Sequence, residues 1–169
     1  METGKVIEAA IAYFENDIRR ISHLLKVYGF AKAIGEEQLD LFTMECLETA
    51  AVLHDIGIKI SEEKYQSSAG KYQELEGPPV AAVILKKLEF PAPVTERVAY
   101  LIGHHHTYDK IEGMDYQILV EADFLVNINE DGLDSSKQGL DSIRKIKENI
   151  FKTKTGTKIL ESIYLSKVN

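Results

Sequence analysis

Hydrophobic residues recur at intervals of three and four along most of the chain, and no segment alternates apolar and polar positions for long. Such intervals place side chains on one face of an α-helix. We expect a first helix over residues 4–19, in which Asn16 or Asp17 causes a break and caps a second helix that reaches Gly35. A third helix is expected from about residue 38 to His54. The pattern therefore predicts an all-α fold.

The second half of the chain continues this pattern after one irregular stretch. Residues 61–77 are polar and have no sustained apolar stripe, so we expect a loop here, with at most a helical turn or two, that contacts the substrate or closes over it. Pro78 and Pro79 are expected to open the next helix, because proline is tolerated in a first helical turn. Further helices are expected over residues 94–104, 115–127, 136–151 and 157–165.

Composition limits the classes of partner. The 169 residues carry a net charge of −7 and no basic cluster, which argues against duplex nucleic acid, since such binding depends on neutralising phosphates. A small nucleotide is still compatible with this charge. No stretch approaches the roughly 20 apolar residues of a membrane span, and the charged N-terminal pattern is not that of a signal peptide. We expect a cytoplasmic protein without membrane contact, and we leave its oligomeric state open.

The single cysteine, Cys46, lies among apolar residues and is expected to be buried.

One segment combines an apolar helix with two polar residues at its end. Ala50–Leu53 suit a helix that is buried on most sides, and His54 and Asp55 follow directly. We expect Gly57 to end this helix in the left-handed conformation, which places both polar side chains at the edge of the core. A buried imidazole and carboxylate need a partner to offset their desolvation, and a divalent cation is one. The alternative is that both residues only cap neighbouring backbone groups.

The other histidines are distributed in a way that favours the metal interpretation. They are His23 and the run His104, His105 and His106, and with Asp123 they lie on separate predicted helices. Metal sites in helical bundles are assembled from facing helices in this manner. Asp123 has apolar neighbours on both sides, which is typical of the core rather than of a surface carboxylate.

Together these residues resemble the HD superfamily of metal-dependent phosphohydrolases. Its pattern is a histidine on one helix, a His-Asp pair at the end of another and an aspartate on a third; here these are His23, His54-Asp55 and Asp123. The flanking sequences Leu53-His54-Asp55-Ile56-Gly57 and Glu121-Ala122-Asp123-Phe124-Leu125 agree with this pattern. The resemblance covers residues 21–127, and it implies a single HD domain over residues 1–169 with additional C-terminal helices at 135–166.

The resemblance implies a metal centre and an activity. His23, His54, Asp55 and Asp123 would bind one divalent transition metal, for which Mn, Fe, Ni, Co or Zn suit the mixed nitrogen and oxygen ligands. The implied reaction is hydrolysis of a small phosphomonoester or phosphodiester, with a nucleotide as one candidate, and Asp55 is an expected catalytic residue. The alternative is a regulatory or ligand-binding HD module without turnover. Some relatives have an assisting glutamate where this chain has Ile58.

The histidine run resembles the paired histidines that hold a second metal in some HD proteins, including the HD-GYP phosphodiesterases. A further histidine usually precedes the proline-led helix in those proteins, and this chain has none there. Glu74 or Glu76 would have to replace it, or the second metal is absent. We favour one metal, with His104 and His105 donating a proton or a hydrogen bond to the substrate. The rest of the HD-GYP signature is missing, so we do not infer cyclic-di-GMP hydrolysis.

Three other residues complete these expectations. His106 is expected to point away from the site, because it is third in the run. Lys59 and Lys71 flank the irregular stretch, and we expect them to contact substrate phosphate, although most surface lysines only increase solubility.

Overall fold

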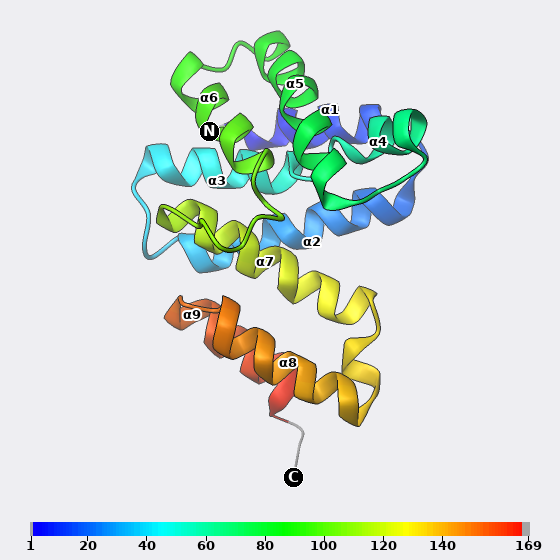
Figure 1. Ribbon diagram of the computed structural model, residues 1–169. Coiled ribbons are helices and arrows are strands. Elements are labelled where there is room, and N and C mark those ends of the chain that lie inside the picture. Colours follow the sequence, from blue (N-terminus) through cyan, green and yellow to red (C-terminus); the bar gives the residue numbers. More distant parts are fainter. Residues whose placement is uncertain (1, 167–169) are drawn as a thin grey trace.

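The computed structural model describes residues 2–166, and this part of the chain contains helices and turns but no strand (Figure 1). The predicted all-α fold is confirmed. The α-helices are α1 (Thr3–Phe14), α2 (Ile18–Gly35), α3 (Leu41–Leu53), α4 (Ile58–Tyr65), α5 (Gly70–Lys87), α6 (Ala92–Ile102), α7 (Met114–Glu130), α8 (Lys137–Ile150) and α9 (Lys154–Leu160). A short 3-10 helix, η1 (Leu133–Ser135), precedes α8, and a π-helical turn, η2 (Glu161–Leu165), follows α9.

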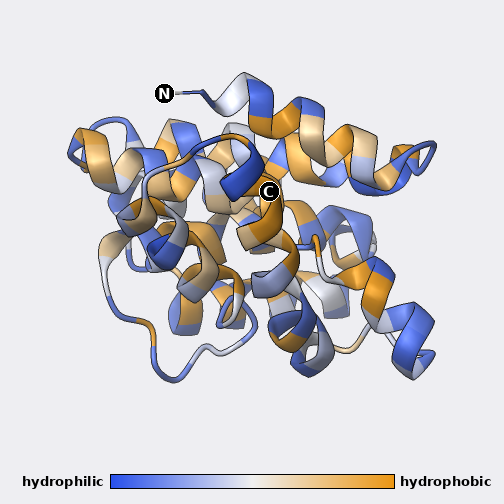
Figure 2. Cartoon of the chain, turned by 90° about the horizontal axis from the view of Figure 1, so that it is seen from above, coloured by the Kyte–Doolittle hydropathy of each residue, from blue (hydrophilic) through white to orange (hydrophobic). Residues whose placement is uncertain are grey.

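Helix α3 lies at the centre of the fold. It packs against α2, α6, α7 and α1, and Ala50–Leu53 are at most 1% exposed. Figure 2 shows hydrophobic and hydrophilic residues interleaved along the helices, as expected for helices with one apolar face. Cys46 is buried on α3 as predicted, and burial raises the pKa of its thiol to about 12. No helix among the described residues is both long and apolar enough to cross a bilayer.

Side-chain caps fix several helix starts. The Asp17 carboxylate accepts a hydrogen bond from the Arg20 backbone N–H, so Asp17 rather than Asn16 caps α2. Asp40 caps α3 in the same way, and the Ser136 hydroxyl caps α8. Each cap satisfies a backbone donor that has no partner within the helix. The three capped starts near residues 18, 41 and 137 lie close to their predicted positions, and so does the start of α7 at residue 114, which has no side-chain cap.

The prediction of a loop over residues 61–77 is wrong. Helix α4 extends to Tyr65 and α5 begins at Gly70, so only four residues between them are not helical. Pro78 and Pro79 lie inside α5 instead of opening it. The buried positions within residues 61–77 are polar or lack a side chain, which removes the apolar stripe: they are Ser61 on α4 and Gln73 and Gly77 on α5.

The expected conformation of Gly57 is also wrong. Its φ is −75° and its ψ is −13°, which any residue can adopt. Residues 54–57 form a turn from α3 into α4. A Cβ atom at Gly57 would lie 2.5 Å from the backbone nitrogen of Gly77 and 2.7 Å from the carbonyl oxygen of Gln73. Glycine is therefore required here because the α5 backbone approaches closely.

The C-terminal helices are fastened to α7. The buried carboxylate of Glu121 accepts hydrogen bonds from the backbone N–H groups of Lys152 and Thr153, and the Tyr164 hydroxyl donates to the carbonyl of Leu125. In Figure 1, α8 and α9 lie on one side of α7, and α1 to α6 lie on the other. The predicted helix over 136–151 is confirmed as α8, while the one expected at 157–165 begins at Lys154.

Candidate metal centre

Three central helices bring the predicted ligands together. His23 lies on α2, His54 and Asp55 follow the end of α3, and Asp123 lies on α7. His54 is fully buried, while His23 is 7% exposed and Asp123 is 4% exposed. Ionisable side chains are rarely buried to this extent unless they are paired or bind a metal.

Donor atoms of His23, His54 and Asp55 lie within 4.8 Å of one another, and Asp123 lies beside the two imidazoles. The Nε2 atoms of His23 and His54 are 3.1 Å apart, and Asp123 Oδ1 lies 3.3 and 3.6 Å from them. Asp55 Oδ2 lies 3.5 Å from each of the two Nε2 atoms. Ligands about 2.1 Å from a shared metal are roughly 3.0 to 3.4 Å apart in octahedral or tetrahedral geometry. The observed spacing is close to this range.

The outer ring nitrogens of both histidines are already committed as donors. Nδ1 of His54 donates to the carbonyl of Ala51 at 2.8 Å, and Nδ1 of His23 donates to the Glu130 carboxylate at 2.8 Å. In the neutral rings, both Nε2 atoms therefore present lone pairs toward each other. Two facing lone pairs need a proton or a cation between them, so the four residues fit a divalent metal.

The charges in the cluster also favour a cation. Burial lowers the pKa of His54, but the Asp55 and Asp123 carboxylates outweigh this effect and raise it to about 9. The pKa of His23 is raised because the same carboxylates outweigh its burial. Burial opposes ionisation of the two aspartates, yet the neighbouring imidazoles hold the pKa of each carboxyl well below its usual range. Without a metal, the cluster therefore retains protons on its histidines.

Two further side chains orient the ligands. Glu130 accepts from His23 Nδ1 and also pairs with Lys26 at 3.1 Å, and the Asn127 amide donates to Asp123 Oδ1 at 2.9 Å. Such outer partners fix the direction of metal ligands and increase their basicity. Neither residue was singled out in the sequence. Asn127 and Glu130 follow Asp123 at four and seven positions, so their helical spacing from the predicted ligand was the available signal.

Comparison with known proteins identifies the family. The family model of the HD domain matches residues 20–155. This chain is an HD domain. None of the curated proteins and none of the solved structures that were compared with it matches. HD domains generally belong to a superfamily of metal-dependent hydrolases, and the buried His/Asp cluster of this HD domain has the donor groups to hold a metal.

A second group of donor atoms shares Asp55 with the first. Asp55 Oδ1 lies 3.5 Å from His105 Nε2, and donor atoms of Asp55, His105 and His106 all lie within 4.8 Å of one another. Nδ1 of His105 donates to the carbonyl of Ile102, which leaves Nε2 facing the carboxylate. The buried Nε2 atoms of His105 and His106 have no hydrogen-bond partner in the described part of the chain. The Asp55 carboxylate thus lies between two groups of ring nitrogens.

The prediction that His106 points away from the site is wrong. Its ring lies 4.0 Å from that of His105, between centroids, and it packs against Gly70, where a Cβ atom would be 2.7 Å from the ring. Burial and the neighbouring His105 lower the pKa of His106 to about 4, so the ring is neutral at physiological pH. The Glu74 carboxylate accepts a hydrogen bond from the backbone N–H of His106 and fixes this turn.

His104 occupies a different position from its two neighbours. Its Nδ1 donates to the carbonyl of Tyr100, and its ring stacks on the Tyr100 ring with centroids 4.2 Å apart. His104 belongs to neither group of donor atoms found among the described residues. The structure therefore brings His105 and His106, but not His104, to Asp55.

The glutamates considered as replacement ligands also lie elsewhere. The Glu74 carboxylate is occupied by the turn that follows α6, where it accepts from the Thr107 hydroxyl as well. Glu76 is bonded to Lys64 and to the Tyr65 hydroxyl. His106, rather than either glutamate, supplies the third group beside Asp55 and His105.

The two lysines expected to contact phosphate are engaged away from the cluster. Lys59 Nζ contacts the carbonyl of Tyr13 at 3.4 Å, and Lys71 Nζ lies 4.6 Å from the centre of the Tyr72 ring. The cavity that reaches the cluster measures about 270 Å³ and has two arginines in its wall instead. Its lining residues are Asp17, Arg19, Arg20, His23, Asp55, Ile58, Glu62, Ser68 and Glu130.

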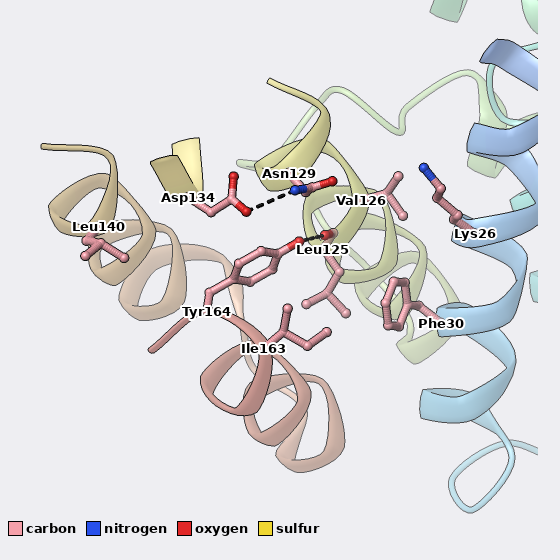
Figure 3. A pocket seen from close by; sticks show the side chains of 9 residues that line it. All are labelled: Lys26, Phe30, Leu125, Val126, Asn129, Asp134, Leu140, Ile163 and Tyr164. Atoms are coloured by element: carbon pink, nitrogen blue, oxygen red, sulfur yellow. Dashed lines mark hydrogen bonds between the residues drawn. The ribbon is translucent and has the colours of Figure 1, made fainter. Parts of the chain in front are cut away.

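A larger cavity of about 660 Å³ lies farther along α2 and α7 (Figure 3). Lys26 and Phe30 come from α2, and Leu125 and Asn129 come from α7, while Tyr164 of η2 faces them. None of the metal-cluster residues lines it. The smaller cavity is the better candidate for the substrate because it opens on His23 and Asp55.

Proposed function

We propose that this HD domain is a metal-dependent phosphohydrolase that acts on a phosphomonoester or phosphodiester, with nucleotides among the substrates to test. The observation that supports this proposal most strongly is the pair of Nε2 atoms of His23 and His54 at 3.1 Å, with Asp55 and Asp123 beside them. Mixed imidazole and carboxylate donors favour Mn, Fe, Ni, Co or Zn over Ca or Mg.

When bound, a divalent metal supplies a Lewis acid for a phosphoryl oxygen and a means of activating water near neutral pH. The chain contributes the orientation of the ligands. Glu130 and the carbonyl of Ala51 hold the two imidazoles in the tautomers that leave Nε2 free. Asp55 contributes charge and reaches both groups of histidines.

We further propose that Asp55, His105 and His106 hold a second cation more weakly than the first site holds its own. The sequence favoured a single metal because two histidines of the run and a bridging aspartate would leave a second metal under-coordinated when no histidine precedes the proline-led helix. In the structure His106 takes the place expected for His104 beside Asp55 and His105, and its lowered pKa keeps its ring available as a neutral donor. Three protein donors leave positions open for substrate oxygens.

The proposal is tested with a panel of phosphate esters and nucleotides, assayed with Mn, Co, Ni, Zn or Fe and with a chelator. Turnover should require added metal and should disappear with the chelator. The variant Asp123→Asn should lose metal and turnover, because it removes a buried charge from the first site. Asp141→Asn is the matched control, since Asp141 is exposed and pairs only with Arg144 on α8.

The outcome also separates this proposal from its alternative. A protein that binds metal but hydrolyses no member of the panel is better described as a ligand-binding HD module. Full retention of metal by Asp123→Asn would contradict the assignment of the first site itself.

A further inference from the structure

The 270 Å³ cavity has more room than a phosphoryl group needs, and one residue in its wall has free donors. Arg19 lies in the first turn of α2, four positions before His23. Side chains four positions apart on a helix lie on the same face. Arg19 is therefore directed to the side of α2 that carries the metal ligand.

The other charged groups of the cavity wall are already engaged. Arg20 pairs with Asp17 at 3.1 Å and with Glu62 at 2.6 Å. Glu130 is bonded to His23 and to Lys26. Arg19 is exposed, and within residues 2–166 it has no ion pair and no side-chain hydrogen bond. Of the two arginines in the wall of this cavity, Arg19 is therefore the one whose guanidinium group is free to bind a ligand.

We propose that Arg19 binds a second anionic group of the substrate, separate from the phosphoryl group at the metal centre. This inference rests on the proposed phosphohydrolase function and narrows its substrate class to small phosphoesters with an additional carboxylate or phosphate. The planar guanidinium matches either group with two parallel hydrogen bonds. The cavity of about 270 Å³ is larger than a phosphoryl group and leaves room for a short carbon chain between the two anions.

The test compares two esters that differ in one group. Glycerol phosphate ends in a neutral alcohol, whereas phosphoglycerate has a carboxylate at that position. Arg19→Ala should raise the KM for phosphoglycerate about tenfold or more, the range expected for a lost charge-assisted hydrogen bond, and should change the KM for glycerol phosphate less than twofold. Propanediol bisphosphate, used in parallel, shows whether a phosphate is preferred to a carboxylate as the second group.

Arg144→Ala is the matched control, because Arg144 is an exposed arginine on α8 that pairs with Asp141. It should leave both KM values unchanged. Calorimetric binding of the phosphonate analogues of both esters to the metal-loaded protein gives a readout that does not depend on turnover. The Arg19→Ala variant should weaken binding of only the analogue with the carboxylate.

Failure of this inference can be distinguished from failure of the proposed function. If the wild-type protein binds the two phosphonates equally, or if Arg19→Ala weakens both equally, Arg19 has no part in selecting a second anion. If no ester is hydrolysed, the proposed function fails, and the calorimetric comparison still decides the role of Arg19.

Discussion

The metal-free protein and the metal-bound protein should respond to pH in opposite ways. The carboxylates beside His54 raise its pKa from 6.5 to about 9, despite its complete burial. A raised folded-state pKa contributes stability that is fully present below pH 6.5 and is lost as the pH rises through about 9. The lowered pKa values of Asp55 and Asp123 contribute stability above about pH 4, which is lost in acid. The pKa of His106, lowered from 6.5 to about 4, contributes stability that is present above pH 6.5 and is lost as the pH falls toward 4, so the metal-free protein should be most stable near pH 6.5.

The size of the effect follows from the shift in the pKa of His54. A shift from 6.5 to about 9 corresponds to about 3 kcal/mol, lost between these two pH values in the metal-free protein. A metal must displace this proton from His54. The apparent affinity for the metal should therefore rise about tenfold for each unit by which the pH is raised, up to about pH 9. Between pH 7 and pH 9 we expect an increase of about a hundredfold from this one group.

Two measurements check this reasoning. Thermal unfolding of the chelator-treated protein from pH 6 to 9 should show a falling midpoint, and added metal should raise the midpoint most at high pH. Calorimetric titration of Zn or Co in buffers of different ionisation enthalpy should show proton release on binding at pH 7. Metal affinity that does not change between pH 7 and pH 9, with no proton released, would refute the assigned arrangement of His54 between two carboxylates.

Three further predictions test separate features of the structure. His105→Ala should lower the metal content from near two to near one per chain by elemental analysis; unchanged metal with turnover reduced about 10²–10⁴-fold would instead make His105 a proton donor. Glu130→Gln should weaken metal binding about 10- to 100-fold in a chelator competition, while Glu148→Gln on exposed α8 should not. Gly57→Ala should destabilise the protein by about 1–3 kcal/mol or more in denaturant unfolding, because its Cβ would meet the α5 backbone, whereas Gly29→Ala has open space and should stabilise α2.

The order and the type of the helices could be predicted because most of them bury an aliphatic stripe. Helix α3 is the strongest case, since its last residues are small or aliphatic and are almost fully buried. The same reasoning failed for residues 61–77, where the buried positions are Ser61, Gln73 and Gly77. A helix that packs through polar and small residues has no hydrophobic period, and the proximity of Gly57 to Gly77 depends on the tertiary structure.

The residues of the buried His/Asp cluster could be predicted from the sequence, because each lies on or next to a helix and has apolar neighbours. The orientation of the histidine run could not be predicted. It follows the end of α6, where backbone direction is set by Glu74 of another helix rather than by local sequence. Arg19 and Arg20 have the same residue type and adjacent positions, and only their ion pairs distinguish them.

The position of Asp55 explains why the core and the metal centre depend on each other. The C-terminal half of helix α3 is buried, so the turn that ends it places His54 in the core and leaves the Asp55 side chain partly accessible at 21%. Asp55 directs one oxygen to His23 and His54 and the other to His105, so a single carboxylate faces ring nitrogens from α2, from the end of α3 and from the turn after α6. Because the Asp55 carboxylate faces imidazoles from these three elements, moving or removing it would leave those imidazoles without a carboxylate partner. Cations on either side of Asp55 would offset its desolvation and would also hold these elements together, so the proposed metal binding would contribute to folding stability as well as to chemistry.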